Sequence, residues 1–483
     1  MRWPTRKPTP PAVVPPLPQP PDTIGSNAPD AIILGRVLTE NGVGPRMRDP
    51  GERHVLVFGP NGSGKGTRLL IPNLLQLEDR SIFVIDPKGE LAAVTAKHRQ
   101  SLGEVVIINP FGVLVDQPGC AHLESRGFNP LTALDPLAPS FNSDTALLAE
   151  ALIKTESQKD PHWDDSARAL VASLIMYVCA EGLVENKPPT LDRVRELLCS
   201  ASKEPSKRHP KGVGIPQMAH DMMESGLRGL RNKAGQFTDW TEEIQSIASS
   251  AKRQTEFLDD DEMADDLNKS SIDFGEMKKR PITVYLILPP QMLMRHARWL
   301  RLLLTSALNA CMRPRQKDEP RLLFMLDEFA ALGHLQIIET VWALVRGYGI
   351  QIMPILQDLN QLKGIYNDRW ETFIGMAGTV FSFGPNDMTT ADWLSRRAGE
   401  TTKVVQGYNQ GASQGNSQST NTGLSWQQVK VPLLPAHKLF GMATGQTLIA
   451  VAGLSNIISG YAPGYWEIAR CVERAEPNPY YHG

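Results

Sequence analysis

The chain has 483 residues, 41% of them hydrophobic, and its 50 Lys and Arg nearly balance 52 Asp and Glu, for a formal net charge of -2. This length is enough for two or three domains with full cores, so we expect a globular protein. The balanced charge excludes a basic field over the whole molecule. Any contact with nucleic acid must therefore come from a local surface.

Cysteine usage and hydropathy favour a cytoplasmic protein. The five cysteines have no metal-site spacing, which indicates a reducing compartment without structural zinc; they are Cys120, Cys179, Cys199, Cys311 and Cys471. No apolar run approaches the roughly 18 to 20 residues that span a bilayer. Proline, rather than an apolar segment, follows the early basic residues, so neither a signal peptide nor a transmembrane segment is expected.

The first 30 residues are rich in proline, and we expect an extended, flexible arm with polyproline II character. The arm could be a ligand for a partner or only a tether. The nucleotide-binding part of the chain is expected to begin after it, with a strand at Ala31–Val37.

A glycine-rich loop follows the apolar strand Val55–Phe58 and precedes an apolar stretch of helical spacing. Its glycines allow successive N–H groups to point at a phosphate, and Lys65 lies at a helix N-terminus, where an anion is favoured. The pattern predicts a loop for a nucleoside triphosphate, although an ordinary glycine turn is the alternative. The binding residues expected are Gly59, Pro60, Asn61, Gly62, Ser63, Gly64, Lys65, Gly66 and Thr67.

The loop departs from the usual G-x-x-x-x-G-K-[ST] pattern at one position, because Gly66 replaces the hydroxyl residue that normally holds Mg²⁺. The nearest hydroxyl belongs to Thr67, which becomes the candidate ligand. This departure leaves the identity of the Mg²⁺ ligand open.

An acidic pair occupies the end of a second apolar strand. Leu322–Leu326 reads as a buried parallel strand, and Asp327 and Glu328 follow it directly. In phosphate-loop NTPases an Asp at this place holds the metal and a neighbouring Glu orients the attacking water. The alternative is an acidic pair that caps a helix.

Strands alternate with helices through much of the chain, which predicts an α/β fold with a mostly parallel, doubly wound sheet. Asp86 ends one strand and could lie beside the phosphate loop or only cap the next helix. Gln357 ends another and should join Lys65 and Asp327, because carboxyl ends of parallel strands share one crevice; it could equally be a satisfied amide. The further strands expected are Val105–Asn109, Ile282–Leu288, Ile350–Leu356, Thr379–Gly384, Gln446–Ala452 and Tyr465–Ala469.

The pattern changes to helical periodicity between about residues 137 and 275, which predicts an all-α insertion. Residues 406–428 carry no charge and are rich in Gln, Ser, Asn and Gly, so a mobile loop is expected there. The domain organisation is therefore an arm at 1–30, a nucleotide-binding domain in two parts at 31–136 and 276–475, the insertion at 137–275, and a tail at 476–483.

The chain resembles the VirD4/TraG family of type IV secretion coupling ATPases, relatives of the FtsK and HerA translocases, over residues 31–475. Several motifs carry the resemblance in order: GPNGSGKG at 59–66, IPNLL at 71–75, DPKGEL at 86–91, NPL at 129–131, HWDDSAR at 162–168, LDEFAALG at 326–333 and ILQDLNQL at 355–362. The resemblance implies a RecA-like P-loop NTPase fold. A Gly after the loop Lys is usual in this family.

The resemblance also implies roles for individual residues. Lys65 and the loop amides bind the β and γ phosphates of ATP, Asp327 serves Mg²⁺, and Glu328 activates water. Gln357 matches the sensor of the γ-phosphate. Arg346, in WALVRGYG, matches a residue that reaches into a neighbouring subunit as an arginine finger, which implies a homo-hexameric ring; a surface salt bridge is the alternative.

The function implied is an ATP-driven motor that couples single-stranded DNA with its relaxase, or secreted protein cargo, to a conjugative type IV secretion system. Family members usually begin with two membrane-spanning helices, where this chain has its proline-rich arm. We therefore expect a peripheral location at the inner membrane, through other components of the secretion system. The alternatives are a soluble FtsK-like or HerA-like DNA translocase and a cargo-docking receptor that does not hydrolyse ATP.

Overall fold

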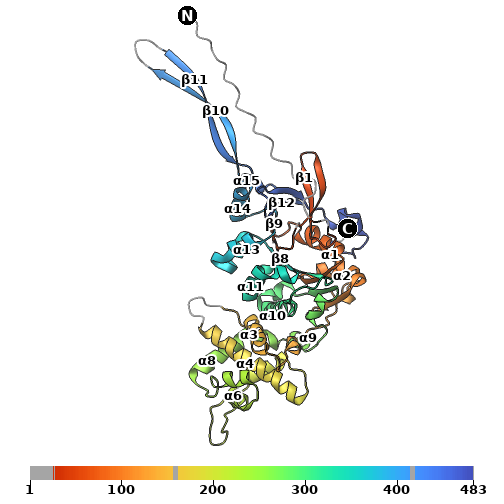
Figure 1. Ribbon diagram of the computed structural model, residues 1–483, viewed down its shortest axis with the longest axis vertical. Coiled ribbons are helices and arrows are strands. Elements are labelled where there is room, and N and C mark those ends of the chain that lie inside the picture. Colours follow the sequence, from red (N-terminus) through yellow and green to blue (C-terminus); the bar gives the residue numbers. More distant parts are fainter. Residues whose placement is uncertain (1–25, 27, 50, 156–161, 414–418, 482–483) are drawn as a thin grey trace.

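The computed structural model describes residues 26, 28–49, 51–155, 162–413 and 419–481, with the side chains of 345–346 and 406–425 outside the description. The proline-rich arm predicted at 1–30 lies almost entirely outside the described residues. Figure 1 shows a central α/β body, a group of helices at one end and a long two-stranded hairpin at the other.

An eleven-stranded sheet forms the centre of the described chain, in the order β2-β1-β13-β12-β9-β3-β8-β7-β4-β6-β5. The seven strands from β9 to β5 are parallel, and the other four are antiparallel. The bounds are β1 (Ile33–Thr39), β2 (Gly42–Arg48), β3 (Val55–Phe58), β4 (Arg80–Ile85), β5 (Glu104–Ile108), β6 (Ile282–Leu286), β7 (Arg321–Leu326), β8 (Ile350–Leu356), β9 (Thr379–Phe383), β12 (Gln446–Val451) and β13 (Ile458–Tyr461).

Both faces of the parallel strands are buried, each in its own hydrophobic core. Leu56 and Phe58 of β3 pack in one core, whereas Val55 and Val57 of the same strand pack in the other. Successive side chains of a strand point to opposite faces, so an uninterrupted apolar strand requires helices on both sides. The predicted doubly wound, mostly parallel sheet is therefore confirmed.

Different helices cover the two faces of the sheet. Side chains of α1 and α2 pack in the second core, and those of α10, α11 and α12 pack in the first. The bounds of the helices around the sheet are α1 (Ile71–Gln76), α2 (Glu90–Leu102), α10 (Leu293–Cys311), α11 (Gln336–Leu344), α12 (Leu359–Tyr366), α13 (Trp370–Met376), α14 (Met388–Ala398), α15 (Ala436–Leu439) and α16 (Ala469–Val472).

The described residues between β5 and β6 contain helices and no strand of the sheet. Their long central helix, α4, packs against α3, α5 and α8. These helices are α3 (Phe141–Leu152), α4 (His162–Glu185), α5 (Leu191–Cys199), α6 (Ile215–Glu224), α7 (Arg228–Ala234), α8 (Glu242–Gln254) and α9 (Asp261–Leu267).

Among the described residues, α4 is the one helix long and apolar enough to cross a membrane. Helix α4 meets this criterion by length and composition alone, and it does not overturn the expectation that the chain lacks an uninterrupted apolar run of that length. Its apolar window is 56% buried inside the protein, and its first turn carries Asp164 and Asp165. These features are typical of the core helix of a helical bundle.

Within the range predicted as a mobile loop, 406–428, the described residues 406–413 and 419–428 belong instead to a hairpin of β10 (Glu400–Ser413) and β11 (Ser419–Pro432). The strands pair in continuous register from Glu400 opposite Pro432 to Ser413 opposite Ser419. Composition misled the prediction, because an uncharged polar strand satisfies its backbone through its partner strand as well as an apolar one does.

Two further differences concern the sheet's edge. Strand β2 was not predicted. It contains Pro45, which an edge strand tolerates. The strand predicted at Tyr465–Ala469 is wrong: Glu467 accepts a hydrogen bond from the Gly464 N–H at 2.9 Å and closes a turn there. The last strand of the sheet is β13 (Ile458–Tyr461), which precedes the predicted segment in the chain.

The exposure of the hairpin leads to a prediction about stability. Val404, Val405 and Trp426 lie on its surface and join neither core. Replacing residues 404–428 with an Asn-Gly turn should shift the thermal unfolding midpoint by less than about 3 °C, since 1 kcal/mol moves the midpoint of a large domain by roughly 2 to 4 °C. Phe324→Ala, in the buried strand β7, should lower stability by about 3 to 5 kcal/mol. A similar loss in the shortened protein would contradict the prediction.

Candidate nucleotide-binding site

The candidate site lies at the carboxyl ends of four neighbouring parallel strands. In the order β3-β8-β7-β4, the strands end in the glycine loop, Gln357, Asp327 and Asp86 respectively. Parallel strands direct their carboxyl ends to one edge, so groups far apart in sequence meet there. The predicted convergence of the loop with Asp327 is present.

The glycines of the loop allow a conformation that other residues rarely adopt. Gly62 and Gly64 have φ of 78° and 88°, in the left-handed region. A Cβ on Gly59 would lie 2.8 Å from Ser63 Oγ and 2.9 Å from the Phe383 ring. The chain thus needs glycine at Gly62 and Gly64 for backbone geometry and at Gly59 for space.

Lys65 begins the π-helical segment η1 (Lys65–Leu70), which continues directly into α1. Its Nζ donates a hydrogen bond of 2.7 Å to the carbonyl oxygen of Gly59, so the side chain folds back over the loop. Unpaired N–H groups at a helix start attract anions, and Lys65 adds a positive charge at the same place.

A cavity of about 490 Å³ opens over the loop. This volume is within the range of ligand sites in proteins. Its lining includes every residue from Pro60 to Thr67, together with Asp86, Lys88, Glu90, Asp327, Glu328 and Tyr481. The structure therefore brings together all the predicted loop residues except Gly59, which lies behind them as the hydrogen-bond acceptor of Lys65.

Two observations bear on whether a nucleotide with its cation would fit. The Oγ of Ser63 is buried and has no hydrogen-bond partner among the described residues, so the loop holds an unsatisfied donor. A Cβ on Gly66 would make only ordinary contacts, the nearest at 3.7 Å from Glu90 Oε2. The hydroxyl of the buried Thr67 remains the loop's candidate for a cation.

The acidic groups of the site are buried, and their electrostatics follow from that. Burial raises the pKa of Asp327 to about 6, against the attraction of Lys65, and raises the pKa of Asp86 to about 7. Burial also lowers the pKa of Lys65, which Asp327 and Glu328 partly offset. A cation that entered the cavity would stabilise the ionised form of both aspartates.

Glu328 has a φ of 52°, which is uncommon outside glycine. Its N–H donates to Asp327 Oδ1 at 3.1 Å, and this contact helps to hold the turn. Backbone strain of this kind is concentrated at functional sites in proteins.

Gln357 and Arg346 lie at opposite ends of β8. Gln357 follows the strand beside the loop, where its N–H donates to Gln361 Oε1 at 2.8 Å, but its side chain does not line the cavity. The backbone of Arg346 lies in η8 (Val345–Tyr348), at the amino end of β8, and its side chain is outside the description. Arg346 is therefore remote from the phosphate loop of its own chain.

The tail contributes residues that the sequence did not single out. Tyr480 donates its hydroxyl to the carbonyl of Lys88 at 2.8 Å, and Asn478 Nδ2 donates to Glu90 Oε1 at 2.8 Å. Tyr481 lines the cavity directly. These contacts join the C-terminal tail to residues about 390 positions earlier in the chain, so no local pattern could have predicted them.

The fold and the loop define a RecA-like P-loop nucleotide-binding protein, and comparisons with solved structures agree on the fold. The conjugative coupling protein TrwBdeltaN70 superposes with a TM-score of 0.62 at 16% identity, covering 89% of each chain. The plasmid coupling protein TrwB in complex with the ATP analogue ADPNP gives a TM-score of 0.61 at 15% identity and covers 86% of each chain.

Comparisons of sequence identify the family. The family model described as "Type IV secretory system Conjugative DNA transfer" matches residues 23–474, and the chain therefore belongs to this family. The conjugal transfer protein TraG of Rhizobium radiobacter is 27% identical over 412 residues, covering 83% of this chain and 60% of the relative. Protein VirD4 of Agrobacterium fabrum is 29% identical over 379 residues, covering 77% and 53%. The chain thus spans roughly half to three fifths of the length of these relatives.

The burial of Asp86 predicts a dependence of stability on pH. Its pKa is about 7 in the folded protein, against an ordinary value of 3.8, so the folded state binds the extra proton between these values. The free energy of unfolding from this group should therefore fall as pH rises from about 4 to 7 and stay constant above. At about 1.4 kcal/mol per pKa unit, the fall is on the order of a few kcal/mol.

Denaturant unfolding of Asp86→Asn should reveal the missing dependence, since an amide does not ionise. The decline between about pH 4 and 7 should be shallower in this variant than in the wild type. Asp318→Asn, at an exposed position, is the control and should keep the wild-type slope. Parallel curves for wild type and Asp86→Asn would refute the assignment.

Proposed function

We propose that this chain is the ATP-driven motor, or coupling protein, of a conjugative type IV secretion system. The observation that carries the proposal is the convergence of Lys65, Asp327 and Glu328 on one cavity over a phosphate loop, in a chain of the conjugative DNA transfer family. The proposal concerns ATP hydrolysis and what hydrolysis drives, which extend beyond family membership.

The ligands proposed are ATP and Mg²⁺. The solved TrwB structures with ADPNP and with ADP and Mg²⁺ support this choice, as do the unsatisfied Ser63 hydroxyl and the buried carboxyls. The loop amides and Lys65 would hold the β and γ phosphates, and Asp327 with Thr67 would hold the cation. The cation supplies charge neutralisation of the transferring phosphoryl group.

Each remaining residue has a distinct proposed task. Glu328, at the cavity wall, orients and deprotonates the attacking water. Gln357 detects the γ-phosphate from the end of β8, which requires its side chain to turn towards the loop. Arg346 acts on the site of a neighbouring subunit, since its place at the amino end of β8 is remote from its own loop.

An arginine finger of this kind requires a ring, and we propose a homo-hexamer. The proposed cargo is single-stranded DNA with its relaxase, or a secreted protein, with the residues of the helical insertion (137–275) selecting it. The membrane would be reached through inner-membrane components of the secretion system. A docking receptor without hydrolysis is less well supported, because Glu328 faces the nucleotide cavity.

ATPase activity with and without single-stranded DNA tests the proposal. Magnesium-dependent hydrolysis that single-stranded DNA stimulates is expected of a DNA motor. Binding of ATP without turnover, under both conditions, would overturn the motor and favour the docking receptor.

The roles of Lys65 and Glu328 should separate in kinetics. Lys65→Ala should weaken ATP binding, because it removes the cation at the phosphates. Glu328→Gln should bind ATP normally and lose about 100-fold or more of turnover, the usual contribution of a general base. Glu371→Gln, with the same charge change on an exposed residue of α13, is the matched control. Near-normal turnover in Glu328→Gln would remove Glu328 from the mechanism.

Mixing subunits should reveal whether Arg346 acts across an interface. Arg346→Ala and Lys65→Ala should each be inactive alone. A mixed ring contains some interfaces where both residues are intact, so mixtures should regain part of the activity. Mixtures that never exceed the sum of the two variants would exclude the finger.

A further inference from the structure

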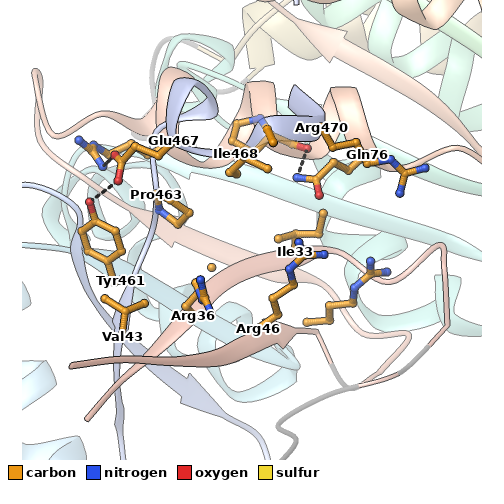
Figure 2. A pocket seen from close by; sticks show the side chains of 15 residues that line it. Ile33, Arg36, Val43, Arg46, Gln76, Tyr461, Pro463, Glu467, Ile468 and Arg470 are labelled. Carbon is orange, nitrogen blue, oxygen red and sulfur yellow. Dashed lines mark hydrogen bonds and ion pairs between the residues drawn. The ribbon is translucent and has the colours of Figure 1, made fainter. Parts of the chain in front are cut away.

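A second cavity, of about 520 Å³, lies on the other side of the helix that begins at Lys65. One wall is the hairpin of β1 and β2, at the edge of the sheet. The opposite wall is the segment after β13, which contains η10 (Tyr465–Glu467) and α16. In Figure 2 the side chains of Arg36 and Arg46 rise from the hairpin towards Pro463 and Ile468.

The lining of this cavity has a strong excess of positive charge. Five arginines line it, namely Arg36, Arg46, Arg48, Arg68 and Arg470, against one carboxylate, Glu467. The lining residues come from three separate parts of the chain, so only the fold brings the arginines together.

Glu467 is already engaged and cannot neutralise the group. It accepts hydrogen bonds from Arg68 at 3.0 Å, from the hydroxyl of Tyr461 at 2.7 Å and from the N–H of Gly464 at 2.9 Å. Arg470 pairs with Glu78, which also binds Arg474. The two arginines of the lining that have carboxylate partners are therefore Arg68 and Arg470.

Arg36, Arg46 and Arg48 have no carboxylate within ion-pair distance among the described residues. Arg36 donates to the carbonyl of Gly44 at 2.9 Å, and Arg48 donates to those of Ala28 and Pro29 at 3.0 and 3.1 Å. Burial, followed by the neighbouring charges of Arg46 and Arg470, lowers the pKa of Arg48. The carboxylate of Asp30, beyond ion-pair distance, offsets only part of the repulsion that Arg48 feels from Arg46 and Arg470, and an anion in the cavity would relieve more of it.

Part of the lining is apolar. Ile33, Val43, Pro72, Pro463 and Ile468 contribute to it, so bare inorganic phosphate would leave much of the cavity unfilled. Guanidinium groups bind phosphate through paired hydrogen bonds, and a phosphate monoester carries roughly 1.5 to 2 negative charges at neutral pH. We propose that this cavity binds an organic phosphate, with its phosphate on Arg36, Arg46 and Arg48 and its apolar part on the opposite wall.

Calorimetric titration with inorganic pyrophosphate can count the sites, because the proposal expects this anion to bind both at the phosphate loop and at the arginines of the second cavity. The wild type should bind two per chain and Lys65→Ala one. The double variant Arg36→Gln with Arg46→Gln should also bind one pyrophosphate per chain, at the phosphate loop. Both substituted residues are exposed. Arg208→Gln with Arg396→Gln makes the same charge change at other exposed positions and should keep both sites. A wild type with one site, lost in Lys65→Ala, would overturn the proposal and leave the phosphate loop intact.

Phenyl phosphate tests the apolar wall in the Lys65→Ala background. It should bind more tightly than inorganic phosphate, and Arg36→Gln with Arg46→Gln should weaken it by about tenfold or more, as expected for lost charged hydrogen bonds. Arg48→Gln alone should weaken it as well, and gives an independent check if the double variant is unstable. Equal binding by all variants would refute the assignment.

The phosphate could belong to a free metabolite or to a lipid headgroup, and vesicles separate the two. Co-sedimentation with phosphatidylcholine vesicles containing phosphatidic acid, abolished by Arg36→Gln with Arg46→Gln, would assign a lipid source. Phenyl phosphate binding without co-sedimentation would assign a free organic phosphate. Absence of both would refute the site.

Discussion

The parallel strands of the sheet are buried on both faces, and the other features of the molecule follow from this constraint. Side chains of β3 and β4 alternate between two cores, so helices must cover each face. Crossovers that return over these faces bring the seven strands from β9 to β5 into the sheet in the same direction. Lys65, Asp86 and Asp327 therefore meet at one edge, although the chain between them includes the whole helical insertion.

Burial also determines the electrostatics at that edge. Burial raises the pKa of both Asp86 and Asp327; a hydrogen bond from the Ala92 N–H partly offsets the rise for Asp86, and the charge of Lys65 partly offsets it for Asp327. The pKa of Lys65 is lowered for the same reason. A site of this kind gains stability from a ligand that supplies both an anion for the loop and a cation for the carboxyls, which is the charge pattern of a nucleotide with its divalent cation.

The helix from Lys65 through α1 lies between the nucleotide cavity and the arginine cavity. Its N-terminus belongs to the phosphate loop, whereas Arg68, Pro72 and Gln76 on its flank face the arginine cavity. Arg68 donates to Glu467 and to the carbonyl of Ala462 beside the arginine cavity, and Lys65 donates to the carbonyl of Gly59 in the phosphate loop. Residues of one helix therefore make contacts at both cavities. A ligand in the arginine cavity would thus contact the same helix that positions Lys65.

The sequence by itself determined those features that depend on neighbours along the chain. The ends of strands β3, β7 and β8 were predicted to within one residue, because an apolar run of strand length between polar residues is a clear signal of a buried strand. The glycine loop could be predicted equally well, because its φ angles and the direction of its N–H groups depend on consecutive residues. Asp327 and Glu328 could be placed from the strand before them. The tertiary structure decided the rest. At 406–413 and 419–428 paired strands stand where the sequence predicted a loop, because pairing of two strands satisfies a polar backbone. The cavity residues Tyr481 and Arg46 reach their sites only through contacts between distant segments, which no local pattern encodes.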